Sequence, residues 1–251
     1  MPFNDNYNNY TANNSGGINT SPWANSEEFE RAASACLARV FMRMFAALLV
    51  TAATALAVVS SQTLMELIFD RSYSFIFLLI IQFALVFAIS AGINKMSYTA
   101  ASILFFTFAV INGLTLSVIF LVYDLGIIYQ AFAVSALMFA AMAIYGTITR
   151  RDLSTVGSVC IMGLFGIIIA SVTNLLFRND MMDAIISYVG VVVFVGLTAY
   201  DTQRIKLRLR EAGAYGQNEA IQGISIIGAL MLYLNFINLF LKILRILARR
   251  R

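Results

Sequence analysis

Seven long apolar runs, separated by short polar stretches, fill most of the chain after residue 40. Each run is close to the ~20 residues that an α-helix needs to cross a bilayer core, and none alternates as a strand does. The pattern therefore predicts an all-α integral membrane protein with seven transmembrane helices. Because the connections are short, consecutive helices are expected to be antiparallel neighbours. The predicted spans are residues 43–61, 73–93, 99–123, 127–148, 156–177, 184–205 and 222–241.

The first 28 residues differ from the rest of the chain. They are rich in Asn, Tyr, Ser and Gly and have no apolar periodicity, which predicts a disordered, cytoplasmic tail. No apolar segment of the kind found in a cleaved secretory signal precedes the first span. The sequence thus divides into a tail at residues 1–28 and a seven-helix membrane domain at residues 29–251.

The composition supports a membrane location and excludes several kinds of functional site. Hydrophobic residues make up 60% of the chain and charged residues 12%, whereas a soluble protein has about a quarter charged. The bilayer is therefore an expected partner. No histidine is present, so imidazole metal sites, catalytic triads and imidazole pH switches are excluded. We expect no enzymatic activity, no bound cofactor and no nucleic-acid partner.

Lys and Arg are distributed unevenly over the two sides of such a bundle. The connections on one side hold Arg71 and Arg178, and the other side carries many more positive charges. Positively charged loops stay in the cytoplasm, so the N-terminus is predicted to be cytoplasmic. The charges on this side are Arg31, Arg39, Arg43, Lys95, Arg150, Arg151, Arg204, Lys206, Arg208 and Arg210.

The C-terminal end conflicts with this charge rule. If the seventh run crosses fully, Lys242, Arg245 and the three arginines at 249–251 lie outside. Either seven spans cross despite these charges, or the last segment is re-entrant and the tail returns to the cytoplasm. We favour seven spans.

Polar residues inside the spans are few. The second and third runs contain the amides Gln82 and Asn112, and the seventh run has the densest set. Its polar and small residues recur at the spacing of one helix face, which has two interpretations. The stripe either joins helices by close packing and amide hydrogen bonds, or lines a wet path through the bundle. Its members are Gln222, Ser225, Gly228, Asn235, Asn238, Lys242 and Arg245.

Asp201 is the clearest acid inside a span, within the stretch "GLTAYDTQRIK". A helix running on to Arg208 places it roughly 10 Å below the cytoplasmic helix end, at 1.5 Å per residue. An ionisable residue at such depth usually marks a functional site. The plainer interpretation is a boundary acid paired with Arg204, which lies one turn further along.

Four blocks of the sequence resemble the transmembrane Bax inhibitor motif family, in particular its bacterial members. They are "INGLTLS", "TRRDLSTVGS", "FVGLTAYDTQRIK" and "GALMLYLNFINLFLKILRIL", in the expected order, and the resemblance covers about residues 30–251. It implies a seven-helix bundle with the seventh helix central. It also implies pH-sensitive calcium leak, suppression of cell death in eukaryotes, or partnership with a membrane-bound protease in some bacteria. The bacterial blocks suggest the cytoplasmic (inner) membrane.

In members that leak calcium, two aspartates on the sixth and seventh helices share a proton and gate the pore. The first corresponds to Asp201, but the second corresponds to Asn235, and an acid of the second helix corresponds to Gln82. An Asp–Asn pair lacks the like-charge repulsion of two carboxylates, and Asn supplies less charge to Ca²⁺. We therefore expect Asp201 to accept a hydrogen bond from Asn235, with a weak calcium site at Asp201.

Two functions follow from these features. The first is a pH-sensitive cation (calcium) leak channel gated at Asp201, with an ion path and pH sensor formed by Asp201, Arg204, Asn235, Asn238, Lys242, Gln82 and Asn112. The second is a non-conducting regulator that binds another membrane protein, such as a protease, or modulates stress and cell-death responses. An intramembrane aspartyl protease is set aside because the seventh run has no second aspartate. A retinal protein is set aside because Lys242 lies too near the helix end.

Overall fold

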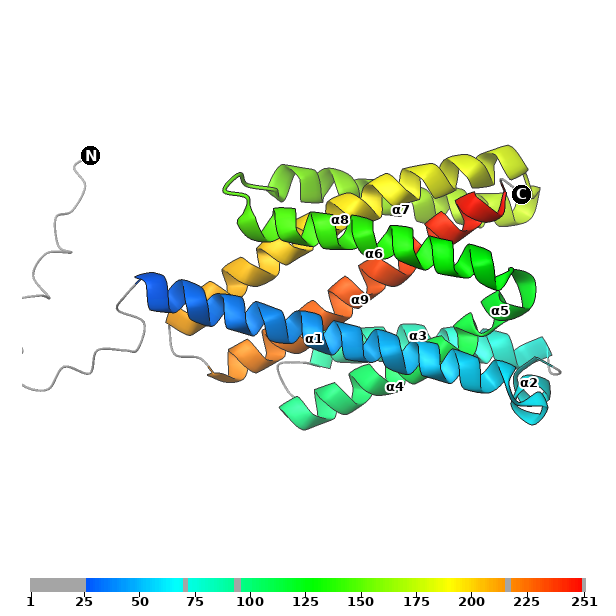
Figure 1. Cartoon of the computed structure of the whole chain (residues 1–251), viewed down its shortest axis with the longest axis horizontal. Coiled ribbons are helices and arrows are strands. Elements are labelled where there is room, and N and C mark those ends of the chain that lie inside the picture. Colours follow the sequence, from blue (N-terminus) through cyan, green and yellow to red (C-terminus); the bar gives the residue numbers. More distant parts are fainter. Residues whose placement is uncertain (1–25, 70–71, 93–95, 215–217, 250–251) are drawn as a thin grey trace, which may run out of the picture.

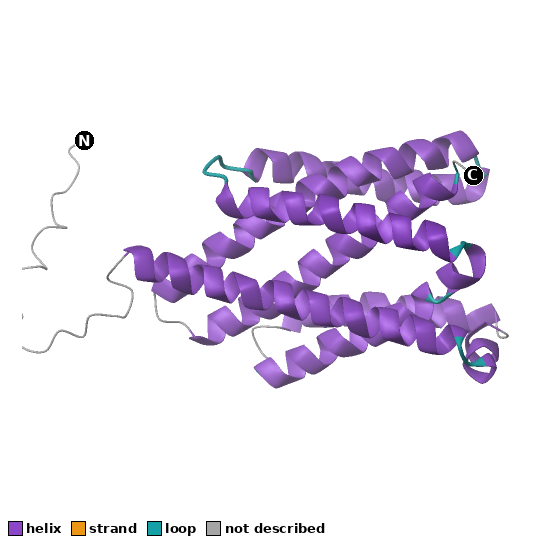
Figure 2. Cartoon of the chain, viewed as in Figure 1, coloured by secondary structure: helices purple, strands orange, loops and turns teal. Residues whose placement is uncertain are grey.

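In a computed structural model of the protein, residues 26–69, 72–92, 96–214 and 218–249 are described, and their regular structure is entirely helical (Figure 2). The all-α prediction is confirmed for this part of the chain. Residues 1–25 of the predicted tail lie outside the described residues. The helices are α1 (Ser26–Val59), α2 (Gln62–Phe69), α3 (Ser72–Gly92), α4 (Tyr98–Leu116), α5 (Val118–Val122), α6 (Leu125–Ile148), α7 (Ser154–Phe177), α8 (Asp180–Ala214) and α9 (Asn218–Ala248).

Each predicted apolar run lies largely within a helix, but the boundaries differ. Helices α8 and α9 continue to Ala214 and Ala248, beyond the apolar runs, and the short α2 was not predicted. The third run is divided at Ser117, where the Ser117 hydroxyl donates a 2.6 Å hydrogen bond to the carbonyl of Leu114. A side chain that bonds the backbone in this way competes with the helical ladder, and α4 ends here.

Within the described residues, six helical segments are long and apolar enough to cross a membrane. The apolar part of α3, Ile76–Gly92, is shorter, so the predicted count of seven spans is not confirmed. Many large apolar side chains on these helices are exposed, as expected for a surface in contact with lipid. The six segments are Ala33–Val59, Tyr98–Val122, Leu125–Ile148, Ser154–Phe177, Asp180–Gly213 and Ala220–Ala248.

Helix α9 runs obliquely through the bundle, between α6, α7 and α8 on one side and α1, α3 and α4 on the other (Figure 1). It contacts α1, α4, α6 and α8. Of its apolar segment, 61% is buried, the largest share among the six, whereas α7 has 11%. Helix α9 is therefore the most buried of the six segments, and α7 faces mainly outward.

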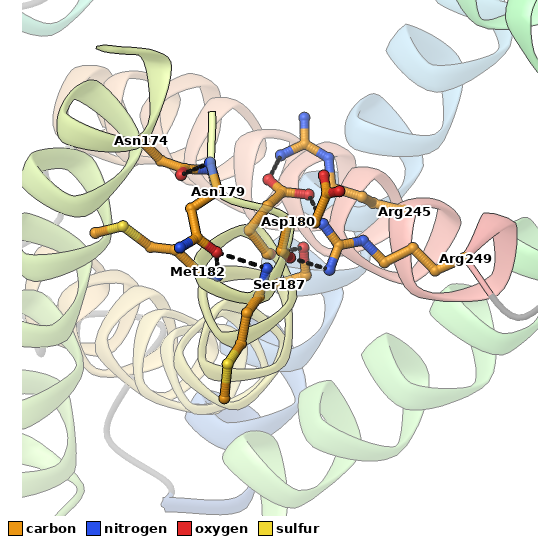
Figure 3. Close-up of polar contacts among 9 residues, drawn as sticks. Asn174, Asn179, Asp180, Met182, Ser187, Arg245 and Arg249 are labelled. Carbon is orange, nitrogen blue, oxygen red and sulfur yellow. Dashed lines mark hydrogen bonds and ion pairs between the residues drawn. The ribbon is translucent and has the colours of Figure 1, made fainter. Parts of the chain in front are cut away.

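The tight turn between α7 and α8 fixes where α8 begins (Figure 3). Arg178 adopts a left-handed conformation at φ 49°, which ends α7. The backbone N–H of Asn179 donates to the Asn174 side-chain oxygen at 2.9 Å. The Asn179 side-chain oxygen in turn accepts from the N–H groups of Met181 and Met182, as an N-cap residue does. These bonds hold the first turn of α8, including Asp183, in place.

Candidate functional site

The predicted pair of Asp201 and Asn235 is brought together between α8 and α9. The Asn235 amide nitrogen donates a hydrogen bond of 2.7 Å to a carboxylate oxygen of Asp201. Asn235 is buried and Asp201 is half-buried. The two positions meet because α8 and α9 pack along much of their length in the antiparallel sense. The hydrogen bond expected from the sequence is therefore present.

The predicted partnership of Asp201 with Arg204 is different. The Arg204 guanidinium lies over the ring of Tyr200, 5.8 Å from its centroid. In the part of the chain that is described, no ion pair within 4 Å joins Arg204 to Asp201. The charges of Arg204 and Arg208 still act on Asp201 at longer range. Asp201 is thus held by an amide, and its contact with Arg204 is electrostatic only.

The stripe on α9 faces α8 at four positions. Gly228 packs against Ile205, Asn235 bonds to Asp201, and Lys242 lies along Gly190. At the end of the stripe, Arg245 pairs with Asp183. Asn238 donates to the carbonyl of Leu234 in its own helix at 2.8 Å. Of the two interpretations of the stripe, close packing between helices is therefore favoured over a wet path, because these side chains make the contact between α8 and α9.

Gln82 and Asn112 belong to a second polar cluster, centred on Tyr233. The Tyr233 hydroxyl accepts from the Asn112 amide at 2.7 Å and lies 2.7 Å from the Thr51 hydroxyl. Gln82 donates to Asn112 at 3.3 Å and to Thr115 at 2.8 Å. These side chains come from α1, α3, α4 and α9, so one hydrogen-bonded cluster joins four helices.

The direction of this chain of hydrogen bonds follows from the donors. Thr51 has one hydroxyl proton, and its oxygen lies 2.9 Å from the carbonyl of Ala109. If that proton is given to Ala109, the Tyr233 proton is directed to Thr51, and Tyr233 accepts from Asn112. Every polar side chain in the sequence Gln82, Asn112, Tyr233, Thr51 then has a partner, as a buried network requires.

Tyr233 and Thr51 were not identified from the sequence. Tyr233 is fully buried, with an exposed fraction of 0%. Its position two residues before Asn235 places it about 200° around α9, away from the polar stripe. A tyrosine within an apolar run needs a hydrogen-bond partner for its hydroxyl. The amides in other runs were the sequence feature that could have indicated this partner. Of the predicted site residues, Asp201 is therefore joined to Asn235, and Gln82 to Asn112, at two different faces of α9.

At the far end of α9, Arg245 and Arg249 reach the first turn of α8 (Figure 3), where both pair with Asp183. Arg245 and Arg249 donate to its two carboxylate oxygens at 2.7 and 2.5 Å, and Arg249 also donates to the carbonyl of Asp180 at 2.6 Å. Beside this clamp lies a cavity of about 330 Å³ that includes Asn238, Lys242 and Arg245 in its lining. The cavity is therefore positively charged where it meets α9.

A strong metal centre is not formed by the described residues. They contain no group of three or more Asp, Glu, Cys or His side chains placed to hold an ion. Calcium prefers six to eight oxygen ligands, of which Asp201 and the Asn235 carbonyl could supply a few. The weak calcium site expected at Asp201 therefore stays a prediction.

The fold and these buried contacts define a polytopic helical membrane protein whose helices are joined by polar side chains. The family described as "Inhibitor of apoptosis-promoting Bax1" matches residues 33–251, and the chain belongs to this family. The resemblance to Bax inhibitor proteins is thus confirmed.

Bacterial relatives match most of the chain. The protein called Inner membrane protein YbhL, from Escherichia coli K12, is 44% identical over 215 residues, 86% of this chain and 92% of its own length. An uncharacterized protein of Borreliella burgdorferi has the same identity and coverage. Another, from Rickettsia prowazekii, is 37% identical over 227 residues, 90% of this chain and 94% of its own.

Proposed function

We propose that the protein is a cation leak channel whose closed state is held by the hydrogen bond between Asp201 and Asn235. The observation that carries this proposal is the 2.7 Å bond from a buried amide to an acid within a membrane-spanning helix. Acids at such depth are expensive and usually functional. Movement of α8 relative to α9 would have to break this contact, so its strength sets how readily the bundle opens.

The proposed trigger is protonation of Asp201. A hydrogen bond to an ionised carboxylate is roughly twice as strong as one between neutral groups. Falling pH neutralises the carboxylate, weakens its bond to Asn235 and favours separation of α8 from α9. Calcium is the proposed ion, bound weakly at Asp201 during passage.

The test is Ca²⁺ flux into proteoliposomes across pH 5 to 8 for the wild type and for Asp201→Asn. We expect wild-type flux to rise as the pH falls, and the flux of Asp201→Asn to lose that dependence. An unchanged pH profile in Asp201→Asn would contradict gating at this residue.

A non-conducting regulator is the second candidate, and one observation favours it. Lys242 lines the 330 Å³ cavity at the far end of α9, and its positive charge repels cations entering there. In this role the polar clusters hold the bundle together while its exposed surface binds another membrane protein, such as a protease. Absence of flux from wild type, Asp201→Asn and Asn235→Asp alike would support the regulator.

We further propose seven crossings around a central α9, in the bacterial inner membrane, with the N-terminus in the cytoplasm. The ion pairs of Arg245 and Arg249 with Asp183 offset the positive charge that opposes an external C-terminus. Helix α9 is also continuous from Asn218 to Ala248, which favours a full crossing over a re-entrant segment. A C-terminal reporter that is accessible only from the cytoplasm would contradict this topology.

A further inference from the structure

A groove of about 850 Å³ lies at the opposite end of the bundle from the Asp183 clamp. It is formed where α6 ends and α7 begins, against the C-terminal part of α8. Four of its lining residues are cations: Arg150, Arg151, Lys206 and Arg210. Neither the ion path nor the polar cluster around Tyr233 uses any of them.

The groove is a fixed feature because α8 holds the connection between α6 and α7. The Gln203 side chain donates to the carbonyl of Arg151 at 2.8 Å and accepts from the N–H of Leu153 at 3.0 Å. Lys206 donates to the carbonyl of Thr147, near the end of α6, at 3.2 Å. These bonds set the backbone from which Arg150 and Arg151 extend.

The groove also contains one carboxylate, Asp152. One of its oxygens accepts hydrogen bonds from Ser154, the first residue of α7. Ser154 donates to it from the hydroxyl at 2.6 Å and from the backbone N–H at 2.9 Å. These bonds lower the pKa of Asp152, so it remains ionised at neutral pH. The guanidinium groups of Arg150 and Arg151 meet no acceptor among the described residues. The positive charge in the groove therefore exceeds the negative.

Apolar side chains border the same groove. Ile148 is 72% exposed and Leu207 is 48% exposed, and both are among the lining residues. Ile148 is the last residue of the span Leu125–Ile148, and Leu207 lies in the last turns of the span Asp180–Gly213. Both are therefore near the level where their helices leave the hydrocarbon. Cations beside exposed apolar residues at that level suit a ligand with an anionic head and an apolar body.

We propose that this groove binds a phosphate group, held by Arg150 and Arg151 with Lys206 and Arg210 nearby. Arginine matches phosphate oxygens with paired N–H donors, and basic pockets between membrane helices hold anionic lipid head groups. The same chemistry is offered by a phospholipid and by a soluble phosphate ester. The exposed Ile148 and Leu207 favour the lipid, whose acyl chains they contact.

The test uses delipidated full-length protein in neutral detergent, with bound molecules counted by native mass spectrometry. Phosphatidylglycerol is titrated against phosphatidylcholine, and glycerol 3-phosphate is titrated separately as a soluble ester. We expect saturable binding of phosphatidylglycerol that Arg150→Gln/Arg151→Gln weakens by about tenfold or more. Asp152→Asn keeps an oxygen for Ser154 and removes the carboxylate charge, so it is expected to bind more tightly.

The matched control is Arg39→Gln/Arg208→Gln, which removes two exposed arginines from the same end of the bundle but outside the groove. It is expected to bind as the wild type does. Binding of phosphatidylglycerol without binding of glycerol 3-phosphate identifies a site for a lipid head group. Binding of glycerol 3-phosphate that the groove variant weakens supports the same site with a soluble ligand. Equal losses in the groove variant and the control, or no phosphate binding by the wild type, would overturn the proposal.

Discussion

The amide of Asn235 in α9 donates a 2.7 Å hydrogen bond to the carboxylate of Asp201 in α8. The family resemblance implies two acids at these positions, whereas this chain has one acid and one amide donor. The Asp–Asn contact lacks like-charge repulsion, and both side chains have a partner while Asp201 is ionised. This relation underlies the proposed closed state.

The first prediction concerns that bond. Asn235→Ala leaves the Asp201 carboxylate without its donor, and a lost bond to a charged group costs about 1.5–3 kcal/mol. The measurement is thermal unfolding in detergent. The control is Asn238→Ala, because within the described part of the chain the Asn238 side chain bonds to the carbonyl of Leu234 in its own helix. Equal destabilisation by the two alanine variants would show that the contact of Asn235 with Asp201 contributes no more to stability than the bond of Asn238 within its own helix.

A second prediction tests the cluster around Tyr233. Tyr233→Phe removes a hydroxyl that accepts from Asn112 and lies against Thr51, so a buried donor loses its partner. The expected loss of stability is about 1–3 kcal/mol. Tyr129→Phe is the control, since Tyr129 is 71% exposed, and it is expected to unfold near the wild-type temperature. A Tyr233→Phe protein as stable as wild type would contradict a stabilising network.

The third prediction concerns the approach of α6 to α8. A Cβ at Gly146 would clash with the backbone carbonyl of Ala199, which cannot move without shifting α8. Gly146→Ala is therefore expected to destabilise the protein by about 1–3 kcal/mol, as overpacking does. At Gly166 on α7 a Cβ meets nothing within 4 Å, so Gly166→Ala is expected to be neutral or slightly stabilising. The reverse order in thermal unfolding would contradict this packing.

The fourth prediction concerns the clamp at the start of α8. Asp183→Asn removes the charge that Arg245 and Arg249 share, and these side chains are partly exposed. The expected loss is about 1 kcal/mol or less at low salt and smaller at high salt. Glu66→Gln on α2 is the control, because Glu66 is exposed and accepts from Gln62 alone in the described part of the chain. A loss independent of salt would argue against an ion pair.

The helices could be predicted from the sequence because each apolar run is long and uniform. The pairing of Asp201 with Asn235 was predictable because the resemblance aligned both positions with a known pair. The cluster at Tyr233 was not, since its members are separated by up to 182 positions in the chain. Such long-range contacts depend on how four helices pack, and the local periodicity of the sequence carries no information about that packing. The break at Ser117 was missed for a similar reason, because its apolar surroundings resemble an unbroken span.

The most direct test of the closed-state proposal is the pH profile of Ca²⁺ flux in proteoliposomes containing Asn235→Asp. This substitution creates two carboxylates in contact, which share a proton and repel each other when both ionise. We predict that the pH dependence of Asn235→Asp differs from that of the wild type and moves toward neutral pH. Identical profiles for the wild type and Asn235→Asp, with flux present in both, would contradict the proposal that the Asp201–Asn235 bond controls opening.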